Sequence, residues 1–333
     1  MVDVVPHKVF NSRAVFVPDG FLVPMHTDGG VYIILLGDDN TPTTQFKITK
    51  EKSGYFYHTG EWRDFNNDGY LDFLTARTDA KKGDGHLLWL ENPGTQATGN
   101  QEWAEHVITE GPDVLFEIYE LDNDASTLEV FAGEFWNEQV TLSILDAATG
   151  VLKNRVVIDD TVKHAYRASV TKLNGDEKKV LIVNNHETST ADTAVYAFEI
   201  PEIDILDASK YVRHTIASEF PVQWGFTNMA PGFTFPVWPY ASDKGKAGKK
   251  GDFLVAGDGD YRAHLLVNSG KDFEYTNELV KDEKGTVGII AIDDVDGDGW
   301  NEFFVANYDK GFVEVYTFKT DARVAARSIE SEI

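Results

Sequence analysis

The chain has 333 residues, of which 42% are hydrophobic and 26% charged, a composition typical of a globular protein with a large core. Acidic residues outnumber basic ones by 55 to 30, and the net charge of -25 disfavours nucleic acids and anionic membranes as partners. The apolar runs, such as residues 31–36, are much shorter than the roughly 20 residues of a membrane-spanning helix.

Three absences bear on the compartment of the protein. The chain has no cysteine and no N-x-Ser/Thr glycosylation acceptor. Its first ten residues lack the basic start and apolar run of a secretory signal. We therefore expect an intracellular, cytoplasmic protein, with secretion as the alternative. The sequence does not indicate an oligomeric state.

A repeat of roughly 50 residues organises the chain into units of four short strand-like segments. Six such units are expected at residues 14–50, 55–110, 114–160, 164–219, 222–282 and 286–320. This pattern predicts an all-β fold, a six-bladed β-propeller forming a single domain over residues 1–320. Seven blades remain an alternative if the long fifth unit contains another. Residues 321–333 are expected to form a short helical or disordered tail.

Residues 6–13 resemble the outermost strands expected at residues 105–112 and 213–221. This segment precedes the first unit, and the last unit lacks such a strand. We therefore expect the amino-terminal strand to complete the last blade and close the ring, which would remove exposed sheet edges.

Two acidic turns, "DFNNDGYLD" at 64–72 and "DVDGDGWNE" at 294–302, place oxygen-bearing side chains at alternate positions around a glycine. Together with one backbone carbonyl each, they suit a hard cation such as Ca²⁺, with Mg²⁺ as an alternative. The expected ligands are Asp64, Asn66, Asp68, Tyr70 and Asp72, then Asp294, Asp296, Asp298, Trp300 and Glu302. The alternative is a hairpin held by its own side-chain to backbone hydrogen bonds.

Both turns and the apolar strands behind them resemble the FG-GAP or VCBS repeats of integrin α-subunits, some fungal lectins and several polysaccharide lyases. Residues 57–112 are similar to the propeller of fungal aldos-2-ulose dehydratases. The resemblance implies a propeller with structural calcium. It also implies that ligands are recognised on the face opposite the acidic turns.

The loops expected on that opposite face are rich in His, Arg, Tyr and Trp. Histidine suits acid-base catalysis, arginine can bind a carboxylate or enolate, and aromatic rings can stack on a ligand. Candidate catalytic residues are His58, Arg77, His164, Tyr166, His186, Tyr261 and Arg262. Candidate substrate-binding residues are His26, Tyr57, Trp136, Trp224, Phe235, Trp238 and Tyr308. Residues 229–251 form an insertion that we expect to be a lid or pocket wall.

The chain has no nucleophile elbow, phosphate-binding loop, dinucleotide fingerprint or zinc motif, so we expect no organic cofactor. These features favour a lyase or cyclase acting on a small, natural-product-like molecule. The resemblance to intracellular fungal propellers suggests a hetero-Diels–Alder type cyclisation. A carbohydrate-binding lectin, a propeller-type sugar or polysaccharide lyase and a protein-binding scaffold are the alternatives. Because the loops differ from unit to unit, one asymmetric pocket is favoured over repeated lectin sites.

Overall fold

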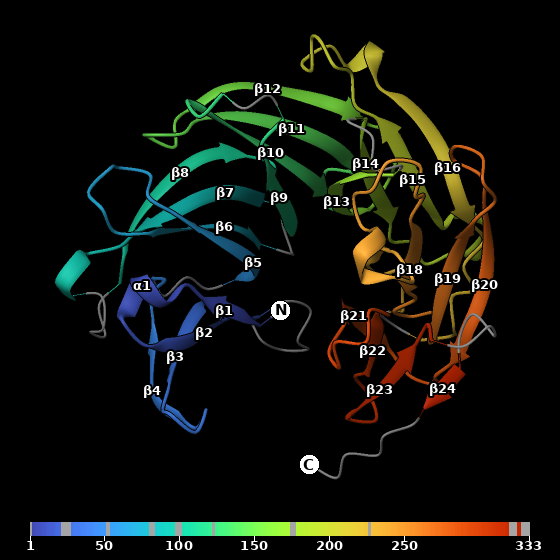
Figure 1. Ribbon diagram of the computed structural model, residues 1–333. Coiled ribbons are helices and arrows are strands. Elements are labelled where there is room, and N and C mark those ends of the chain that lie inside the picture. The colour runs from blue at the N-terminus through green and yellow to red at the C-terminus, as the bar shows by residue number, and fades with distance from the viewer. Residues whose placement is uncertain are drawn as a thin grey trace. The chain divides into compact units, whose positions relative to one another are not determined.

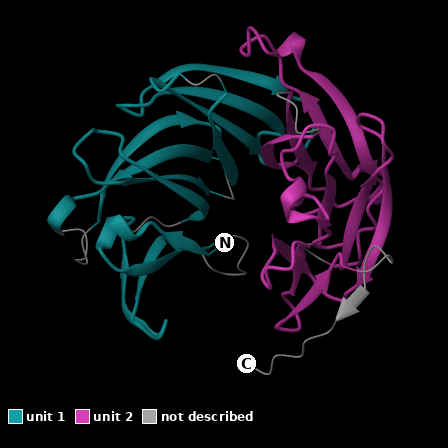
Figure 2. Ribbon diagram, viewed as in Figure 1, with its two compact units in different colours: residues 1–163 teal, residues 164–333 magenta. Residues whose placement is uncertain are grey.

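The computed structural model describes residues 2–20, 28–50, 54–79, 84–96, 102–121, 124–173, 178–225, 228–319 and 325–327. Six antiparallel sheets of four strands follow one another along the chain (Figure 1). Three belong to a compact unit of residues 1–163 and three to a second unit of residues 164–333 (Figure 2). The predicted six-bladed β-propeller is confirmed.

Unit 1 contains the first three sheets, and their strands pair in chain order. The first sheet has β1 (Asp3–Val5), β2 (Arg13–Pro18), β3 (Val31–Leu36) and β4 (Pro42–Lys47), with helix α1 (His7–Phe10) between β1 and β2. The second has β5 (Tyr55–Arg63), β6 (Asp72–Asp79), β7 (Asp84–Glu91) and β8 (Ala104–Glu110), with η1 (Gly94–Gln96) before β8. The third has β9 (Leu115–Tyr119), β10 (Thr127–Glu134), β11 (Gln139–Asp146) and β12 (Leu152–Asp159).

Unit 2 contains the other three sheets. The fourth sheet has β13 (Ala165–Lys172), β14 (Lys179–Asn185), β15 (Ala194–Glu199) and β16 (Val212–Ser218), with η2 (Thr190–Asp192) and η3 (Ala208–Lys210) in its connections. The fifth has β17 (Thr234–Val237), β18 (Asp252–Ala256), β19 (Arg262–Asn268) and β20 (Tyr275–Asp282), with η4 (Ala241–Asp243) after β17. The sixth has β21 (Val287–Asp293), β22 (Glu302–Asn307), β23 (Phe312–Thr317) and β24 (Ala325–Arg327).

The burial of each strand follows its place in the sheet. All eight residues of β6 are buried, whereas the fourth strands β8 and β20 are mostly exposed or half-buried. The core between the first two sheets is aromatic, with the Phe16 and Phe73 ring centroids 5.0 Å apart. Glycine is required at position 60, where a Cβ atom would lie 2.0 Å from Cζ of Phe73. Interleaved aromatic packing of this kind stabilises neighbouring blades.

The predicted closure by residues 6–13 is wrong. In unit 1, β1 pairs with β2, so the amino terminus completes the first sheet. In unit 2, β24 pairs with β23 and supplies the fourth strand of the last sheet. Pro6 has no amide hydrogen for a ladder, and Asn11 takes a left-handed φ of 50° at the end of α1. These two residues prevent the segment from running as one extended strand.

The acidic turns and the other hairpin loops lie at opposite ends of their strands, as predicted. In unit 2, residues 294–301 connect β21 to β22, and residues 308–311 connect β22 to β23. The pairing is antiparallel throughout, so successive turns alternate between the two ends of a sheet. Within the described residues, no helix is long and apolar enough to cross a bilayer.

Candidate functional site

Unit 2 brings an aspartate and a histidine together at the loop ends of its fourth and fifth sheets. His186 directly follows β14, and Asp258 lies in the loop after β18. The distance from His186 Nε2 to Asp258 Oδ2 is 3.9 Å. On the other side of the ring, Nδ1 of His186 lies 2.9 Å from the carbonyl oxygen of Pro231. This contact favours the tautomer with a proton on Nδ1, which leaves the lone pair of Nε2 facing Asp258.

The protonation of this pair is set mainly by burial. The pKa of His186 is lowered to about 4, mainly by loss of hydration and to a smaller extent by His164, while the contact with Pro231 opposes this shift. Loss of hydration also raises the pKa of Asp258 to about 7, with a smaller contribution from the Asp309 carboxylate. The Asp258 side chain remains 27% exposed, so a small molecule can still reach it. At neutral pH the site therefore pairs an uncharged imidazole with a carboxyl group close to its own pKa.

The loop that carries Asp258 is strained and firmly anchored. Asp258 has a φ of 53° and Tyr261 a φ of 67°, and left-handed backbone is especially unfavourable for a bulky residue such as tyrosine. The loop is fixed by Asp260, which is fully buried and contacts both Nε2 of His264 and Nη1 of Arg262. Strain of about 1–3 kcal/mol per residue is retained only where the surroundings enforce it, and such positions cluster at functional sites.

Aromatic and charged side chains surround the pair. The ring of Tyr166 stacks on His186 with centroids 4.5 Å apart, and burial raises the pKa of its hydroxyl. The Arg167 guanidinium lies 5.1 Å from the ring centroid of Phe233 and 4.9 Å from that of Phe235. Stacking of this kind holds the guanidinium in place as a cationic group.

Four other predicted residues belong to this part of unit 2. His164 Nδ1 lies 3.0 Å from Glu187 Oε1, and Glu187 in turn bridges to Ala230 through the backbone. Asn228 donates to the Tyr261 hydroxyl over 2.8 Å, so that hydroxyl can still donate its own proton. Phe235 is connected to the pair through the rings of Phe233 and Tyr166, and Arg262 contacts Asp260, two positions after Asp258. The structure thus groups His164, Tyr166, His186, Tyr261, Arg262 and Phe235 in one region.

The remaining aromatic candidates of unit 2 are not part of this group. Trp224 is 100% exposed and Tyr308 is 82% exposed. Trp238 is buried, and its indole nitrogen donates to the carbonyl oxygen of Lys249 over 3.0 Å. The structure therefore gives Trp238 a packing contact, while Trp224 and Tyr308 stand at the surface.

The candidates in unit 1 have different surroundings. The Arg77 side chain is only 5% exposed; its Nη1 donates to Glu105 over 2.9 Å, and its guanidinium lies 4.9 Å from the ring centroid of Tyr55. Burial lowers the pKa of His58 to about 3, and raises that of Tyr57 to about 12. Trp136 packs on Phe56 with centroids 5.5 Å apart. His26 lies outside the described residues.

Sequence reasoning did not identify three members of the unit 2 cluster. Asp258, Glu187 and Arg167 were not among the candidate residues, although all three stand within or beside predicted ligand-face loops. The signal for Asp258 was its position between two glycines, which marks a sharply turning loop in which aspartate tolerates left-handed backbone.

The acidic turns have the backbone geometry expected of cation-binding loops. Gly69 N donates to Asp64 over 3.0 Å, and Gly299 N donates to Asp294 over the same distance. In each turn the other oxygen, Oδ1 of Asp64 or Asp294, is buried with no hydrogen-bond partner among the described residues. Such orphaned oxygens fit a bound cation, because buried polar atoms otherwise find partners.

The two turns differ in how well their oxygens converge. In the second turn, ligand atoms of Asp294, Asp296 and Glu302 lie within 4.8 Å of one another. In the first, Asn66 stands in place of Asp296, and Asp72 accepts from the backbone amides of Phe65 and Asn92, both over 2.8 Å. In the second turn Lys319 contacts Asp298, which balances part of the local negative charge.

Comparison with known proteins yields structural similarity at low sequence identity. No family model and no curated protein sequence matches the chain. Exo-β-1,3-galactanase from Phanerochaete chrysosporium, solved with β-1,3-galactotriose, matches at a TM-score of 0.47 and 13% identity, over 94% of this chain and 66% of its own. The Dos1 propeller matches at 0.48 and 10% identity, over 92% and 74%. α-L-Arabinofuranosidase from Lactobacillus brevis matches at 0.43 and 15%, over 90% and 91%.

These neighbours are propellers or carbohydrate-active enzymes, but such TM-scores and identities assign no activity to this chain. The chain spans about two thirds of the length of the galactanase. Its assignment as a six-bladed β-propeller rests on its own six four-stranded sheets.

Proposed function

We propose that the chain is an enzyme without an organic cofactor that eliminates water from a carbonyl-bearing sugar or a similar polyhydroxylated molecule. The observation that carries this proposal is the pairing of Asp258, whose pKa burial raises to about 7, with an uncharged His186 3.9 Å away. A general base with a pKa near the operating pH combines a high deprotonated fraction with good proton affinity.

The elimination would use the residues of unit 2 as follows. The Asp258 carboxylate removes a proton from the carbon next to the substrate carbonyl. That electron pair forms a carbon–carbon double bond, and the hydroxyl on the next carbon leaves as water after receiving a proton. Asp258, now protonated, or the Tyr261 hydroxyl supplies that proton, while Arg167 or Arg262 balances the enolate oxygen. Burial keeps His186 uncharged, while the stacked ring of Tyr166 and the carbonyl oxygen of Pro231 keep it oriented.

Among the reaction classes expected from the sequence, elimination fits this pair better than a hetero-Diels–Alder cyclisation. A pericyclic cyclisation transfers no proton, so it gives no reason for an aspartate with a raised pKa beside an uncharged histidine. The resemblance of residues 57–112 to aldos-2-ulose dehydratase propellers points to the same reaction. A lectin would also bind sugars, and it is distinguished by the absence of turnover.

The pH dependence of turnover tests the assignment of Asp258. We expect kcat/KM for an active keto-sugar to rise with pH through about 7, because the base must be deprotonated. Asp309→Asn should move that rise to lower pH, because the Asp309 carboxylate contributes to the raised pKa. Asn can preserve the contact that Asp309 makes with the amide of Thr286.

The matched control is Glu278→Gln, which removes an equal charge from an exposed carboxyl group on β20 of the same unit. It should leave the profile in place. A profile that is flat across pH 6–8, or equal shifts in both variants, would rule out Asp258 as the titrating base.

We also propose that both acidic turns bind structural Ca²⁺, as in FG-GAP or VCBS repeats. The expected ligands are those predicted from the sequence, and the orphaned Oδ1 atoms of Asp64 and Asp294 support them. The ion would neutralise the clustered carboxylates and cross-link each turn. The ion of the second turn would lie at the Asp293 end of β21. Val287, at the other end of this strand, pairs with Asp258, so no catalytic step passes through the ion.

Calcium should therefore raise stability rather than supply catalysis. With free Ca²⁺ at about a hundred times its Kd, the free energy of unfolding should increase by about 2.7 kcal/mol per site. Asp294→Asn should lose the increase due to the second turn, whereas Asp293→Asn, one residue before it, should keep it. Isothermal titration calorimetry measures Ca²⁺ binding by each variant, and Tm with and without chelator measures the stability increase. Equal Tm values with Ca²⁺ and with chelator would contradict the proposal.

A further inference from the structure

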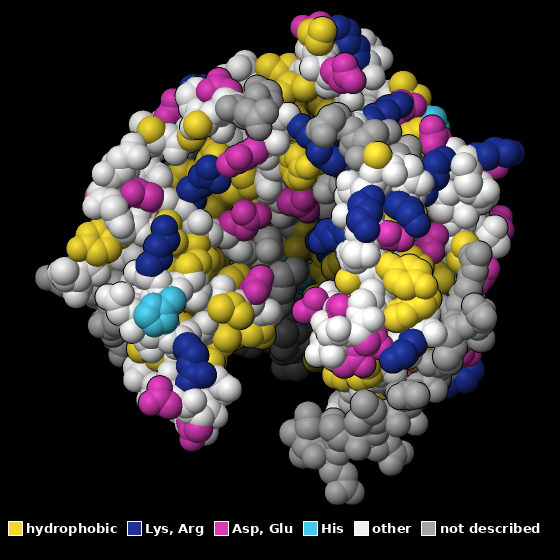
Figure 3. All heavy atoms as spheres, in the orientation of Figure 1, with side chains coloured by type: hydrophobic (Ala, Val, Ile, Leu, Met, Phe, Trp, Pro, Cys, Tyr) yellow, Lys and Arg dark blue, Asp and Glu magenta, His cyan; other side chains and the backbone are white. Residues whose placement is uncertain are grey.

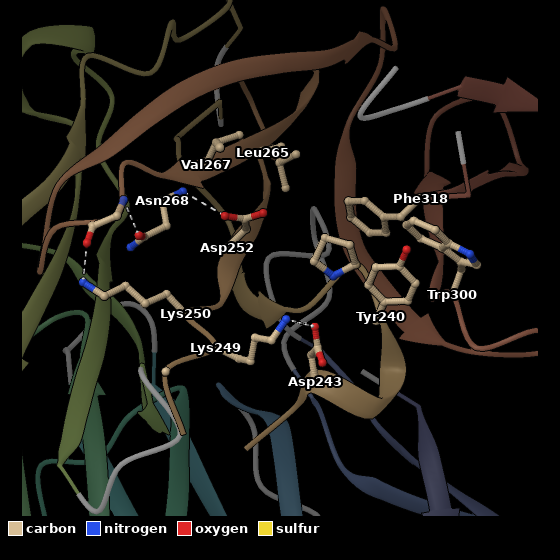
Figure 4. A pocket seen from close by; sticks show the side chains of 13 residues that line it. Tyr240, Asp243, Lys249, Lys250, Asp252, Leu265, Val267, Asn268, Trp300 and Phe318 are labelled. Atoms are coloured by element: carbon tan, nitrogen blue, oxygen red, sulfur yellow. Dashed lines mark hydrogen bonds and ion pairs between the residues drawn. The ribbon is translucent and has the colours of Figure 1, made fainter. Parts of the chain in front are cut away.

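A second cavity in unit 2 is separate from the acid-base pair. It has a volume of about 590 Å³ and lies between strands β18 and β19 and residues 239–250 (Figure 4). This volume is typical of small-molecule sites. Asp252, at the start of β18, lines the cavity, whereas Asp258 follows the other end of that strand. A five-residue strand is roughly 15 Å long, so the two sites do not overlap.

One side of the cavity is apolar and contains flat aromatic rings. Leu265 and Val267 of β19 and Phe318 after β23 are buried side chains that line it. Tyr240 and Trp300 pack beside them with ring centroids 3.8 Å apart and ring planes tilted by 35°, and Figure 4 shows these rings opposite the lysines. An apolar or aromatic group of a ligand would be stabilised on this side, because its surface would be removed from water.

The rest of the lining carries two lysines, Lys249 and Lys250, beside two aspartates, Asp243 and Asp252. Residues 239–250 contain four lysines and a single acidic residue, Asp243. Asp243 is shared by Lys246, 3.6 Å away, and Lys249, 3.1 Å away, so one carboxylate faces two ammonium groups. Lys250 also lines the cavity and pairs with Asp272 over 2.7 Å. Basic and hydrophobic side chains lie side by side on the face of unit 2 in Figure 3.

The wall formed by residues 239–250 is fixed to the second acidic turn. Ala241 N donates to the carbonyl oxygen of Gly299 over 3.0 Å, and Asn301 N donates to that of Pro239 over 2.9 Å. Asn301 also donates through its side chain to the carbonyl oxygen of Trp238 over 2.7 Å. The cavity is therefore largely preformed, which reduces the entropy lost when a ligand binds.

We propose that this cavity binds a small organic anion with a flat apolar body, such as an aromatic carboxylate or sulfonate. The ring system would lie against Trp300 and the apolar floor, and the anionic group would lie at Lys249 and Lys250. This site is independent of the proposed elimination, since none of its lining residues belongs to the acid-base pair.

Fluorescence titration with 8-anilinonaphthalene-1-sulfonate tests the proposal on the full chain. We expect one site per chain, and binding about tenfold weaker in a Lys249→Ala/Lys250→Ala variant. Lys244→Ala is the matched control: it removes an exposed lysine of the same segment that does not line the cavity, and binding should be unchanged. Trp300→Leu should weaken binding as well, with the Tm of each variant recorded alongside.

A neutral probe and added salt give readouts on the unmodified protein. N-phenyl-1-naphthylamine, the same ring system without the sulfonate, should bind at least about tenfold more weakly. Raising NaCl from about 50 to 500 mM should weaken the binding of the sulfonate probe and leave that of the neutral probe unchanged, because salt screens the charges of the lysines. Equal affinity for both probes, or equal losses in the Lys244 and Lys249/Lys250 variants, would overturn the proposal.

Discussion

Asp258→Asn is expected to reduce turnover by at least about a hundredfold, because removal of a general base typically costs 10²–10⁴ in rate. The amide keeps the size and shape of the carboxyl group, so the loop at residues 257–261 should keep its backbone. His186→Gln, which replaces the partner 3.9 Å away, should reduce turnover less, since it removes the orienting group and leaves the base. Full activity of Asp258→Asn in a folded protein would contradict the assignment.

The same substitution should increase stability above neutral pH. Burial raises the folded-state pKa of Asp258 to about 7, well above the value of 3.8 for a free side chain. The folded protein therefore binds a proton that the unfolded chain has released, and this aspartate costs stability increasingly as pH rises from about 4 to 7. Asp258→Asn removes a cost on the order of 2 kcal/mol at pH 8, discounted because solvent still reaches the side chain.

Thermal or urea unfolding across pH 4–8 measures this difference. The Tm of Asp258→Asn should exceed that of the unmodified protein at pH 8, and the two should converge towards pH 4. His186 acts in the other direction: its lowered pKa means that stability is lost as pH falls from about 6.5 to 4. A gain in Tm together with a loss of turnover is the signature of a residue retained for chemistry at the expense of stability.

Breaking the buried ion pair of unit 1 should have the largest effect on folding. Glu105→Ala leaves the Arg77 guanidinium, 5% exposed, without its carboxylate, and should cost about 3–5 kcal/mol of unfolding free energy. The double variant Arg77→Met/Glu105→Leu replaces both charges with apolar groups of similar size and should recover most of that loss. Chemical denaturation of the single and double variants measures the coupling.

This double variant also tests the catalytic role predicted for Arg77. If Arg77 is a structural residue, the folded double variant keeps its turnover. If Arg77 binds substrate, turnover falls even though stability is restored. Equal stability of Glu105→Ala and the unmodified protein would show that the pair contributes little to folding.

The sequence was most informative where a physical requirement repeats. Strand-like segments at a regular spacing predicted six four-stranded sheets, and the acidic residues of 294–302 predicted a turn in which Asp294, Asp296 and Glu302 converge. The alternation of hairpins predicted which loops lie opposite that turn. These features depend on local chain geometry, which short stretches of sequence encode.

Features that depend on distant neighbours were not predictable. β1 and β24 have three residues each, too few to show a periodic pattern, so their pairings were missed. The properties of Asp258 arise from burial and from Asp309, 51 positions along the chain. Arg77 was predicted in a ligand-face loop between the second and third strands, whereas it lies within β6 and pairs with Glu105 on the fourth strand of the same sheet.

Conversion of a keto-sugar by the purified protein tests the central claim most directly. Elimination of water next to a carbonyl produces a conjugated double bond, which is followed by ultraviolet absorbance and confirmed by the mass loss of one water. The proposed function predicts that at least one member of a keto-sugar panel is converted by the unmodified protein, that conversion requires no added organic cofactor, and that Asp258→Asn stops it. Sugar binding without any conversion, or equal conversion by Asp258→Asn, would contradict it.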